Sequence, residues 1–227
     1  CKKRIGASIM GEEAKSALLK AVERARTYLE AEDAAREKLL TITREITRLS
    51  RQAIFRLHDG DVEEAGKILD QLALLAKELQ EFRTSNPRLY YGGSVTNALT
   101  EYVEANALFC YMKGLEIPSF EELKVEPVHY LLGLADFTGE LRRLLLRHLS
   151  NGEYQEAERE LRYMENVYRA LVSIAVPEAL VPGLRRKVDV LRAIIESSIR
   201  DFHYSQSSSK LEQAIREMLC ELRGENV

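Results

Sequence analysis

Apolar residues recur every three or four positions along nearly the whole chain, and no segment shows the strict alternation of a half-buried strand. Clusters of glycine, proline, asparagine and aspartate separate these segments. The last segment is expected to begin at Ser207–Ser209, because serine is favoured at helix N-caps. The predicted helices cover residues 12–58, 62–82, 95–113, 128–149, 153–172, 184–204 and 207–222. The sequence therefore predicts an all-α fold of about seven helices in a single domain.

Two of the predicted turns have similar sequences, GDVEEA at residues 60–65 and GEYQEA at residues 152–157. Each follows one helix and opens another, which is typical of an antiparallel helical hairpin. Helical solenoids use such turns with a period of about 34 residues, whereas these two lie much farther apart. We therefore expect two hairpins and no repeat array.

The charge balance excludes a strongly basic nucleic-acid-binding protein, since 33 Lys and Arg face 36 Asp and Glu for a net charge of −3. Any basic surface that binds nucleic acid must be local. No window reaches the roughly 18 apolar residues of a membrane span, and no secretory segment is evident. Cys1, Cys110 and Cys220 form no paired motif, which favours free thiols and a cytoplasmic location.

The start of the chain is interpreted separately from the rest. The first methionine is Met10, so residues 1–10 are expected to be a leader or an added segment. Residues 11–227 are expected to form the helical domain.

Four acidic residues are the strongest candidates for chemistry. Glu101 and Glu104 are three positions apart on one predicted helix, so they share a face. Asp136 and Glu140 are four apart and are the only acids between residues 127 and 151, a leucine-rich segment. Four carboxylates would converge if the two helices faced each other, and such a cluster repels itself unless a cation neutralises it.

Two glycines on the second of these helices, Gly133 and Gly139, are expected to permit its close approach to a neighbour. Carboxylate oxygens without a His–Cys pattern suit Mg²⁺, with Mn²⁺ as a substitute, and a carboxylate-held Mg²⁺ can support phosphodiester hydrolysis. The alternative is a structural one. Glutamates on an amphipathic helix are commonly a solvated face, and the acids could form salt bridges with basic residues of the same helix, namely Arg142, Arg143 and Arg147.

The acidic segments also carry a family resemblance. Residues 101–105 (EYVEA) and 130–141 (YLLGLADFTGEL) resemble the translin/Trax family, and within it the Trax branch, the catalytic C3PO-type subunit, including prokaryotic and archaeal homologues. The resemblance extends to residues 44–51 and 184–189 and covers roughly residues 30–200. It implies a translin-like bundle of seven helices that assembles into hollow shells and cleaves RNA as a Mg²⁺-dependent endoribonuclease.

By this resemblance, the family's catalytic and metal-binding acids fall on Glu101, Glu104, Asp136 and Glu140. All four positions are filled, which favours a catalytic subunit over a binding-only one. The implied substrate is single-stranded or locally unpaired RNA, with single-stranded DNA as a further ligand. The implied assembly is a homo-oligomer with an octamer-like shell, or one with a translin-like partner subunit.

Two groups of arginines are candidates for RNA binding. Arg44, Arg48 and Arg51 recur at helical spacing and could form the basic ridge that single-stranded nucleic acid requires. The alternative is an ordinary charged helix face with Glu37 and Glu45 as partners.

Arg143 and Arg147 lie one and two turns beyond Glu140 on the same helix face, so they could hold the phosphate to be cleaved. Arg143 also matches an arginine of the family motif. Tyr90 and Tyr91 beside a Gly-Gly pair could stack on bases, although loop aromatics more often pack onto the domain.

Other chemistries find less support. Glu126 and His129 form one E-x-x-H pair, whereas di-iron bundles use two. No Walker loop, dinucleotide fingerprint or serine-nucleophile motif occurs. The functions kept open beside the nuclease are a noncatalytic scaffold of the same fold that binds single-stranded RNA or DNA, and a helical interaction protein without nucleic-acid affinity.

Overall fold

The computed structural model describes residues 2–223 and, within them, contains helices and no strands, which confirms the predicted fold class. Six of these helices are longer than four turns and one, α3, is a single turn. The helices are α1 (Lys2–His58), α2 (Val62–Ser85), α3 (Pro87–Tyr90), α4 (Gly93–Lys113), α5 (Pro127–Asn151), α6 (Tyr154–Val172) and α7 (Leu184–Arg223).

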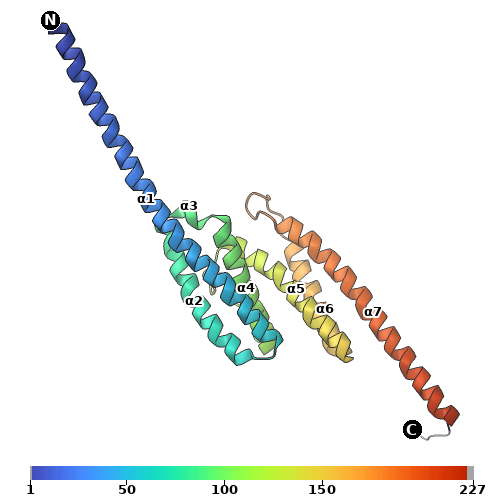
Figure 1. The fold of residues 1–227 in the computed structure, drawn as a ribbon. Helices are drawn as coiled ribbons and strands as arrows, with labels where there is room; N and C mark the ends of the chain where they lie inside the picture. The colour runs from blue at the N-terminus through green and yellow to red at the C-terminus, as the bar shows by residue number, and fades with distance from the viewer. Residues whose placement is uncertain (1, 224–227) are drawn as a thin grey trace.

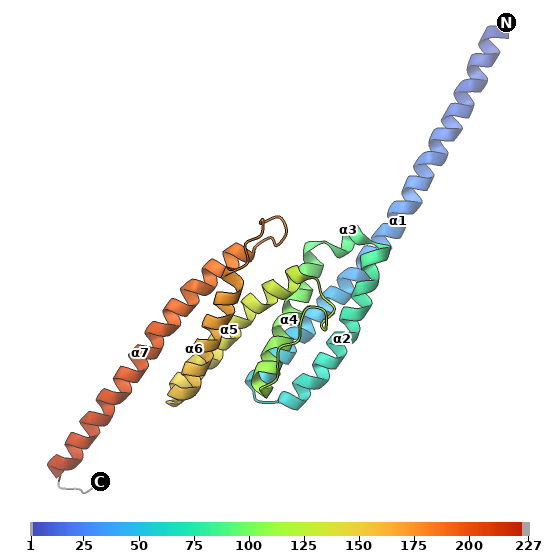
Figure 2. The same ribbon diagram turned by 180° about the vertical axis from the view of Figure 1, so that it is seen from behind.

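The helices form one elongated body (Figure 1). The second half of α1 packs against α2 and α4, α4 packs against α5, and α5 is covered by α6 and α7. Figure 2 shows the same order from behind, with the pair α4 and α5 in the middle of the molecule. The first half of α1 and the last part of α7 project from opposite ends.

Two matching turns join the helical hairpins α1–α2 and α5–α6, as the similar sequences predict. Gly60 and Gly152 adopt φ values of +83° and +77°, a left-handed conformation that glycine adopts without steric cost. Their N–H groups donate to the carbonyls of Leu57 (3.0 Å) and Leu149 (3.1 Å), which end the preceding helices. The Asp61 side chain then accepts a bond from a backbone N–H of the first turn of α2.

The structure corrects two predicted boundaries. The last two predicted helices are one, because α7 continues through Ser207–Ser209 without a break. Serine in a helix interior costs only about 0.5 kcal/mol relative to alanine, and no glycine or proline is present to stop the helix. The segment predicted as a loop at residues 86–93 contains the short helix α3, which begins at Pro87, a residue favoured in the first turn.

The core runs along the middle of the bundle and includes the whole predicted apolar stripe of α1. Its residues there are less than 9% exposed: Leu39, Ile42, Ile46, Leu49, Ala53 and Leu57. A histidine and a glutamate are also buried. His129 is 2% exposed beside the ring of Tyr90, and Glu160 is 1% exposed and accepts a hydrogen bond from Tyr111.

The projecting ends carry apolar side chains that no other described residue covers. We call residues 14–34 the N-terminal arm and residues 210–222 the C-terminal arm. The exposed apolar residues include Leu18, Val22 and Leu29 on the first and Leu211, Ile215, Met218 and Leu222 on the second. Their spacing of mostly three or four positions places them on one face of each helix. Among the described residues, no helix is apolar over a length that could cross a membrane.

Candidate carboxylate site

The site is created by the close approach of α4 and α5 at Gly133. A Cβ atom at residue 133 would lie 2.6 Å from Cβ of Val103 and 2.8 Å from the carbonyl oxygen of Thr100. The two helix backbones can therefore meet here only because residue 133 has no side chain. The prediction that Gly139 also permits a close approach between helices is wrong, since a Cβ atom there would have nothing within 4 Å.

This approach brings the four predicted acids together around Glu104. Burial, and after it the negative charges of Asp136, Glu140 and Glu101, raise the pKa of Glu104 to about 8, while the Lys187 ammonium opposes them. The carboxylates of α4 and α5 thus act on one another, as the sequence predicts. A protonated Glu104 is the form that the metal-free protein favours at neutral pH.

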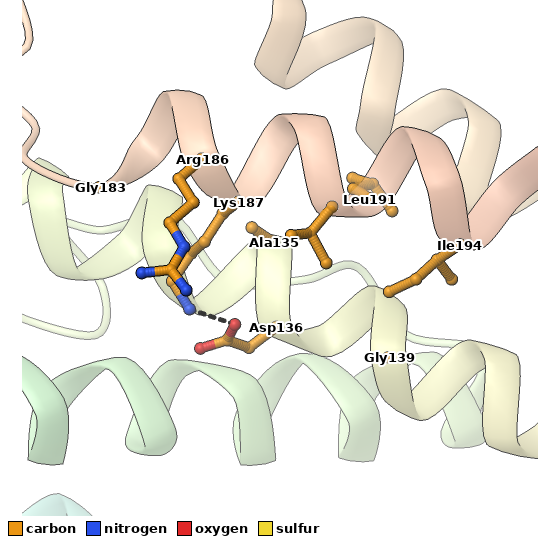
Figure 3. A pocket seen from close by; sticks show the side chains of 9 residues that line it. Ala135, Asp136, Gly139, Gly183, Arg186, Lys187, Leu191 and Ile194 are labelled. Atoms are coloured by element: carbon orange, nitrogen blue, oxygen red, sulfur yellow. Dashed lines mark hydrogen bonds and ion pairs between the residues drawn. The ribbon is translucent and has the colours of Figure 1, made fainter.

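The other three acids face basic side chains from distant segments. Arg51 of α1 donates two hydrogen bonds to Glu101, from Nε to Oε2 at 3.0 Å and from Nη2 to Oε1 at 2.8 Å. Lys187 of α7 pairs with Asp136, as the dashed line in Figure 3 marks. These pairs tie α1 to α4 and α5 to α7 across the site.

Glu140 has two basic neighbours. Nε2 of His58, at the end of α1, contacts its Oε2, and Nη1 of Arg143 lies 3.8 Å from the same oxygen. Glu104, by contrast, takes part in no side-chain hydrogen bond or ion pair within the described residues. It is the one acid of the four whose charge no neighbouring base neutralises directly.

The donor set fits a hard divalent cation, because it consists of carboxylate oxygens with an excess of negative charge around Glu104. In the described part of the chain, no group of three or more His, Cys, Asp or Glu side chains is arranged as the ligands of one ion. The reason lies in the pairs just described, since Arg51, Lys187 and His58 hold three of the carboxylates. A cation at this site therefore competes with the protein's own bases.

The proposed basic ridge on α1 is divided between two roles. Arg44 is exposed, and Arg48 pairs with Glu45 at 2.6–2.8 Å, the partner that the alternative interpretation names. Arg51 points instead to Glu101 and belongs to the carboxylate site. Arg44 and Arg48 therefore remain candidates for contact with RNA phosphates.

Of the three arginines that the salt-bridged alternative names on α5, Arg143 pairs with an acid of the site, Glu140, and the other two turn elsewhere. Arg142 turns to α7, where it bonds to Ser198 at 2.7 Å and to Asp201 at 2.9 Å, away from the acids of the site. Arg147 donates to the backbone oxygen of His58 at 2.7 Å and so caps the end of α1. Arg143 is exposed beside Glu140, in the position predicted for a phosphate contact.

The two tyrosines have different environments. Tyr90 is fully buried, and its hydroxyl accepts a hydrogen bond from Gln80 at 2.9 Å. The prediction that Tyr90 could stack on RNA bases is therefore wrong. Tyr91 is 60% exposed and packs edge-on against Tyr90. The hydroxyl–amide bond explains how a tyrosine can be buried in a segment that the sequence marks as a loop.

His58 of the site was not predicted from the sequence, nor were Lys187 and its neighbour Arg186. The last two lie in a segment that carries the family resemblance, Leu184–Asp189, and the run of three basic residues at a helix start is a signal for them. His58 gave no such signal, because it sits at the end of a helix far from the acids in sequence. Its contact with Glu140 depends on the packing of the α1–α2 turn against α5.

Comparison with known proteins agrees with this architecture. The chain is 32% identical over 190 residues to an uncharacterized protein of Methanocaldococcus jannaschii, covering 83% of this chain and 84% of that protein. It is 24% identical over 196 residues to the Translin-associated protein X homolog of Schizosaccharomyces pombe, covering 80% of this chain and 84% of that protein.

Solved structures show the same fold. The crystal structure of AfC3PO superposes with a TM-score of 0.75 at 37% identity, covering 82% of this chain and 97% of the other. A complex of AfC3PO with duplex RNA gives the same TM-score at 36% identity and the same coverage. Residues 34–198 match the Translin family, and this segment contains α2 to α6, most of the core and all four acids. The chain therefore belongs to the translin family.

Proposed function

We propose that the protein is a Mg²⁺-dependent endoribonuclease that cleaves single-stranded or locally unpaired RNA at the carboxylate site. The observation that carries the proposal is Glu104, a carboxyl group without a partner that is surrounded by three further carboxylates of α4 and α5. A protein that used these acids only for stability would gain by pairing all four of them. The relation to AfC3PO, solved in complex with duplex RNA, supports RNA as the ligand.

In this proposal, Glu101, Glu104, Asp136 and Glu140 hold the cation, and Mn²⁺ can replace Mg²⁺. When bound, the ion would polarise a phosphate and lower the pKa of a coordinated water molecule. The chain's own bases have complementary tasks. Arg143 is exposed next to Glu140 and can bind the phosphate, while Arg51 holds Glu101 through two hydrogen bonds and fixes its orientation.

We further propose that the protein acts as a homo-oligomer with an octamer-like shell, or together with a translin-like subunit. The uncovered apolar faces of the N-terminal and C-terminal arms support an assembly, since large apolar side chains in regular rows are typical of helix–helix interfaces. A cytoplasmic location is part of the proposal, supported by the free thiols of Cys110 and Cys220; Cys1 lies outside the described residues.

The second candidate is a noncatalytic scaffold that binds single-stranded RNA or DNA. The observation in its favour is that Arg51, Lys187 and His58 already pair with three of the four acids. In that case the pairs are structural, and RNA binds through exposed arginines such as Arg44 and Arg143. A helical interaction protein, the third class, would show no salt-sensitive affinity for nucleic acid.

One experiment separates these functions. A fluorescent single-stranded RNA and a matched duplex are incubated with the purified chain in Mg²⁺ or in EDTA, and the products are resolved on a gel. Binding is measured in parallel at two salt concentrations. Asp136→Asn removes one carboxylate of the site, and Asp70→Asn, an exposed residue of α2, is the control.

The proposal predicts Mg²⁺-dependent cleavage of the single strand by the parent and by Asp70→Asn, and its loss in Asp136→Asn. Salt-sensitive binding without cleavage would support the scaffold, and repeating the assay with a translin-like subunit would test whether a partner restores cutting. If neither RNA binds, the nuclease and the scaffold are both rejected.

A further inference from the structure

A cleft lies directly beside the carboxylate site, between α5 and α7. Its volume is about 410 Å³, which is within the range of about 300–1,000 Å³ that is usual for small-ligand sites. Asp136 belongs both to the cleft wall and to the group of four acids. A molecule in this cleft therefore touches the candidate site from the side of α7. The lining residues are Ala135, Asp136, Gly139, Gly183, Arg186, Lys187, Val190, Leu191 and Ile194.

The cleft has one apolar side and one charged end. Val190, Leu191 and Ile194 line it from α7, and Val190 is 52% exposed although it is apolar. Opposite them on α5, Gly139 leaves space, because a Cβ atom there would have nothing within 4 Å. The approach of α4 and α5 does not require a glycine at residue 139. Its missing side chain instead keeps this part of the cleft open.

The charged end presents a cation without a partner. Among the described residues, Arg186 forms no ion pair, whereas its neighbours Arg185 and Lys187 pair with Glu178 and Asp136. Figure 3 shows Arg186 and Lys187 pointing from α7 toward α5, on the side of Asp136. The guanidinium of Arg186 can therefore bind an anion that enters the cleft.

We infer that this cleft binds the nucleotide next to the cleaved bond, with its phosphate on Arg186 and its base against Val190, Leu191 and Ile194. The inference rests on the proposed function, since it assigns a place to one nucleotide of the RNA substrate. The chemistry requires a ligand with an anionic end and a flat apolar part. A nucleoside monophosphate has both, and the lining residues run from Asp136 along α7 to Ile194.

The test measures binding without cleavage. Adenosine 5′-monophosphate, adenosine 3′-monophosphate, adenosine and inorganic phosphate are titrated into the full chain in EDTA by calorimetry. Three variants are compared with the parent. Arg186→Ala removes the anion contact, Gly139→Leu fills the cleft, and Arg192→Ala removes an arginine of the same helix that pairs with Glu196 outside the cleft.

We expect at least one of the two monophosphates to bind, and to bind more tightly than adenosine or phosphate alone. Arg186→Ala should weaken this binding by about tenfold or more, Gly139→Leu should abolish it, and Arg192→Ala should leave it unchanged. Whether the 5′- or the 3′-monophosphate binds more tightly shows on which side of the cleaved bond the nucleotide in the cleft lies. Circular dichroism melts establish that each variant is folded.

The inference is overturned if neither monophosphate binds, or if Arg186→Ala and Gly139→Leu bind it as the parent does. The cleavage assay keeps this result separate from the nuclease proposal. Cleavage by the parent with no effect of the two variants on binding rejects the nucleotide cleft and leaves the nuclease. Binding that depends on Arg186 and Gly139, in a chain that never cuts RNA, rejects the nuclease and leaves the cleft as a nucleotide site.

Discussion

Gly133 of α5 faces Val103 of α4 so closely that a Cβ atom on residue 133 would lie 2.6 Å from Cβ of the valine. Glu104 is the next residue after Val103, and Asp136 lies about one turn beyond Gly133. The contact that sets the distance between the helices therefore also sets the distance between the acids. Stability and the carboxylate site depend on the same glycine.

Gly133→Ala should damage both properties. The added methyl group must push α4 and α5 apart, because the nearest atoms are a buried side chain and a backbone oxygen, and such overpacking costs about 1–3 kcal/mol. Urea unfolding should show the loss of stability, and RNA cleavage should fall. Gly139→Ala is the control for stability, since it has free space and should stabilise the helix by about 0.5–1 kcal/mol. Equal stability of the two variants would contradict this account.

Glu104 predicts an unusual pH dependence. Burial and three carboxylates raise its folded-state pKa to about 8, whereas in the unfolded chain it ionises near the ordinary value of 4.5. Between these values the folded state binds more protons, so this residue's contribution to stability is lost as the pH rises from 4.5 through 8. Glu104→Gln should therefore be more stable than the parent at pH 9 in EDTA, by on the order of 3–5 kcal/mol.

Urea unfolding of the parent and of Glu104→Gln at pH 5 and pH 9 checks both the sign and the size of the stability difference between them. The difference between them should shrink toward pH 5, where the parent's Glu104 is neutral in the folded state. A glutamine variant that is less stable than the parent at pH 9 would show that the ionised carboxylate has a stabilising partner in the metal-free protein.

Cation binding at the site should release a proton. At pH 7 the raised pKa keeps Glu104 mostly protonated, and a carboxylate must lose its proton to bind Mg²⁺. Calorimetry in buffers of different ionisation enthalpy should count about one proton released per Mg²⁺ bound at pH 7. Glu104→Gln should abolish this release. Binding with the same proton count in the variant would place the Mg²⁺ elsewhere on the protein.

His129 predicts a loss of stability in acid that is independent of the site. Burial lowers its pKa to about 4, from an ordinary value of 6.5, and Nδ1 has no hydrogen-bond partner among the described residues. The unfolded chain therefore takes up a proton first as the pH falls, so the contribution of His129 to stability should fall by roughly 3 kcal/mol between pH 6.5 and pH 4, opposite in sign to the contribution of Glu104.

The comparison of His129→Leu with His203→Leu isolates this effect. His203 is exposed at α7, so its replacement should leave the slope of stability against pH unchanged. His129→Leu should gain stability relative to the parent as the pH falls through the same window. An unchanged slope in His129→Leu would assign the acid sensitivity to other residues.

The sequence predicts the fold well where local chemistry decides it. Gly60 and Gly152 mark turns because few other residues adopt a positive φ, and both turns are present. The helix start predicted at Ser207–Ser209 is wrong, because serine favours a helix start only when the preceding residues leave the helix. Here the hydroxyl of Tyr154 donates a hydrogen bond to the backbone of Ser205 and holds that turn of α7 against α6. The capping preference of serine is weaker than this packing.

The carboxylate site likewise has a part that local sequence patterns predict and a part that depends on tertiary packing. The spacing of Glu101, Glu104, Asp136 and Glu140 places each pair on one helix face, and that part needs only the helical period. The pairing of Arg51 with Glu101 and of Lys187 with Asp136 joins residues about 50 positions apart, so it depends on how whole helices pack. No local pattern contains that information.

The Lys187–Asp136 pair makes the carboxylate site and the cleft thermodynamically linked. A cation at the acids competes with Lys187 for Asp136, and an anion in the cleft competes with Asp136 for Lys187. A cation at Asp136 would release Lys187 to bind the anion beside Arg186, so each ligand should tighten the binding of the other by the same factor. In the proposed function, an ion pair that holds two helices together would thus make cation and anion binding cooperative.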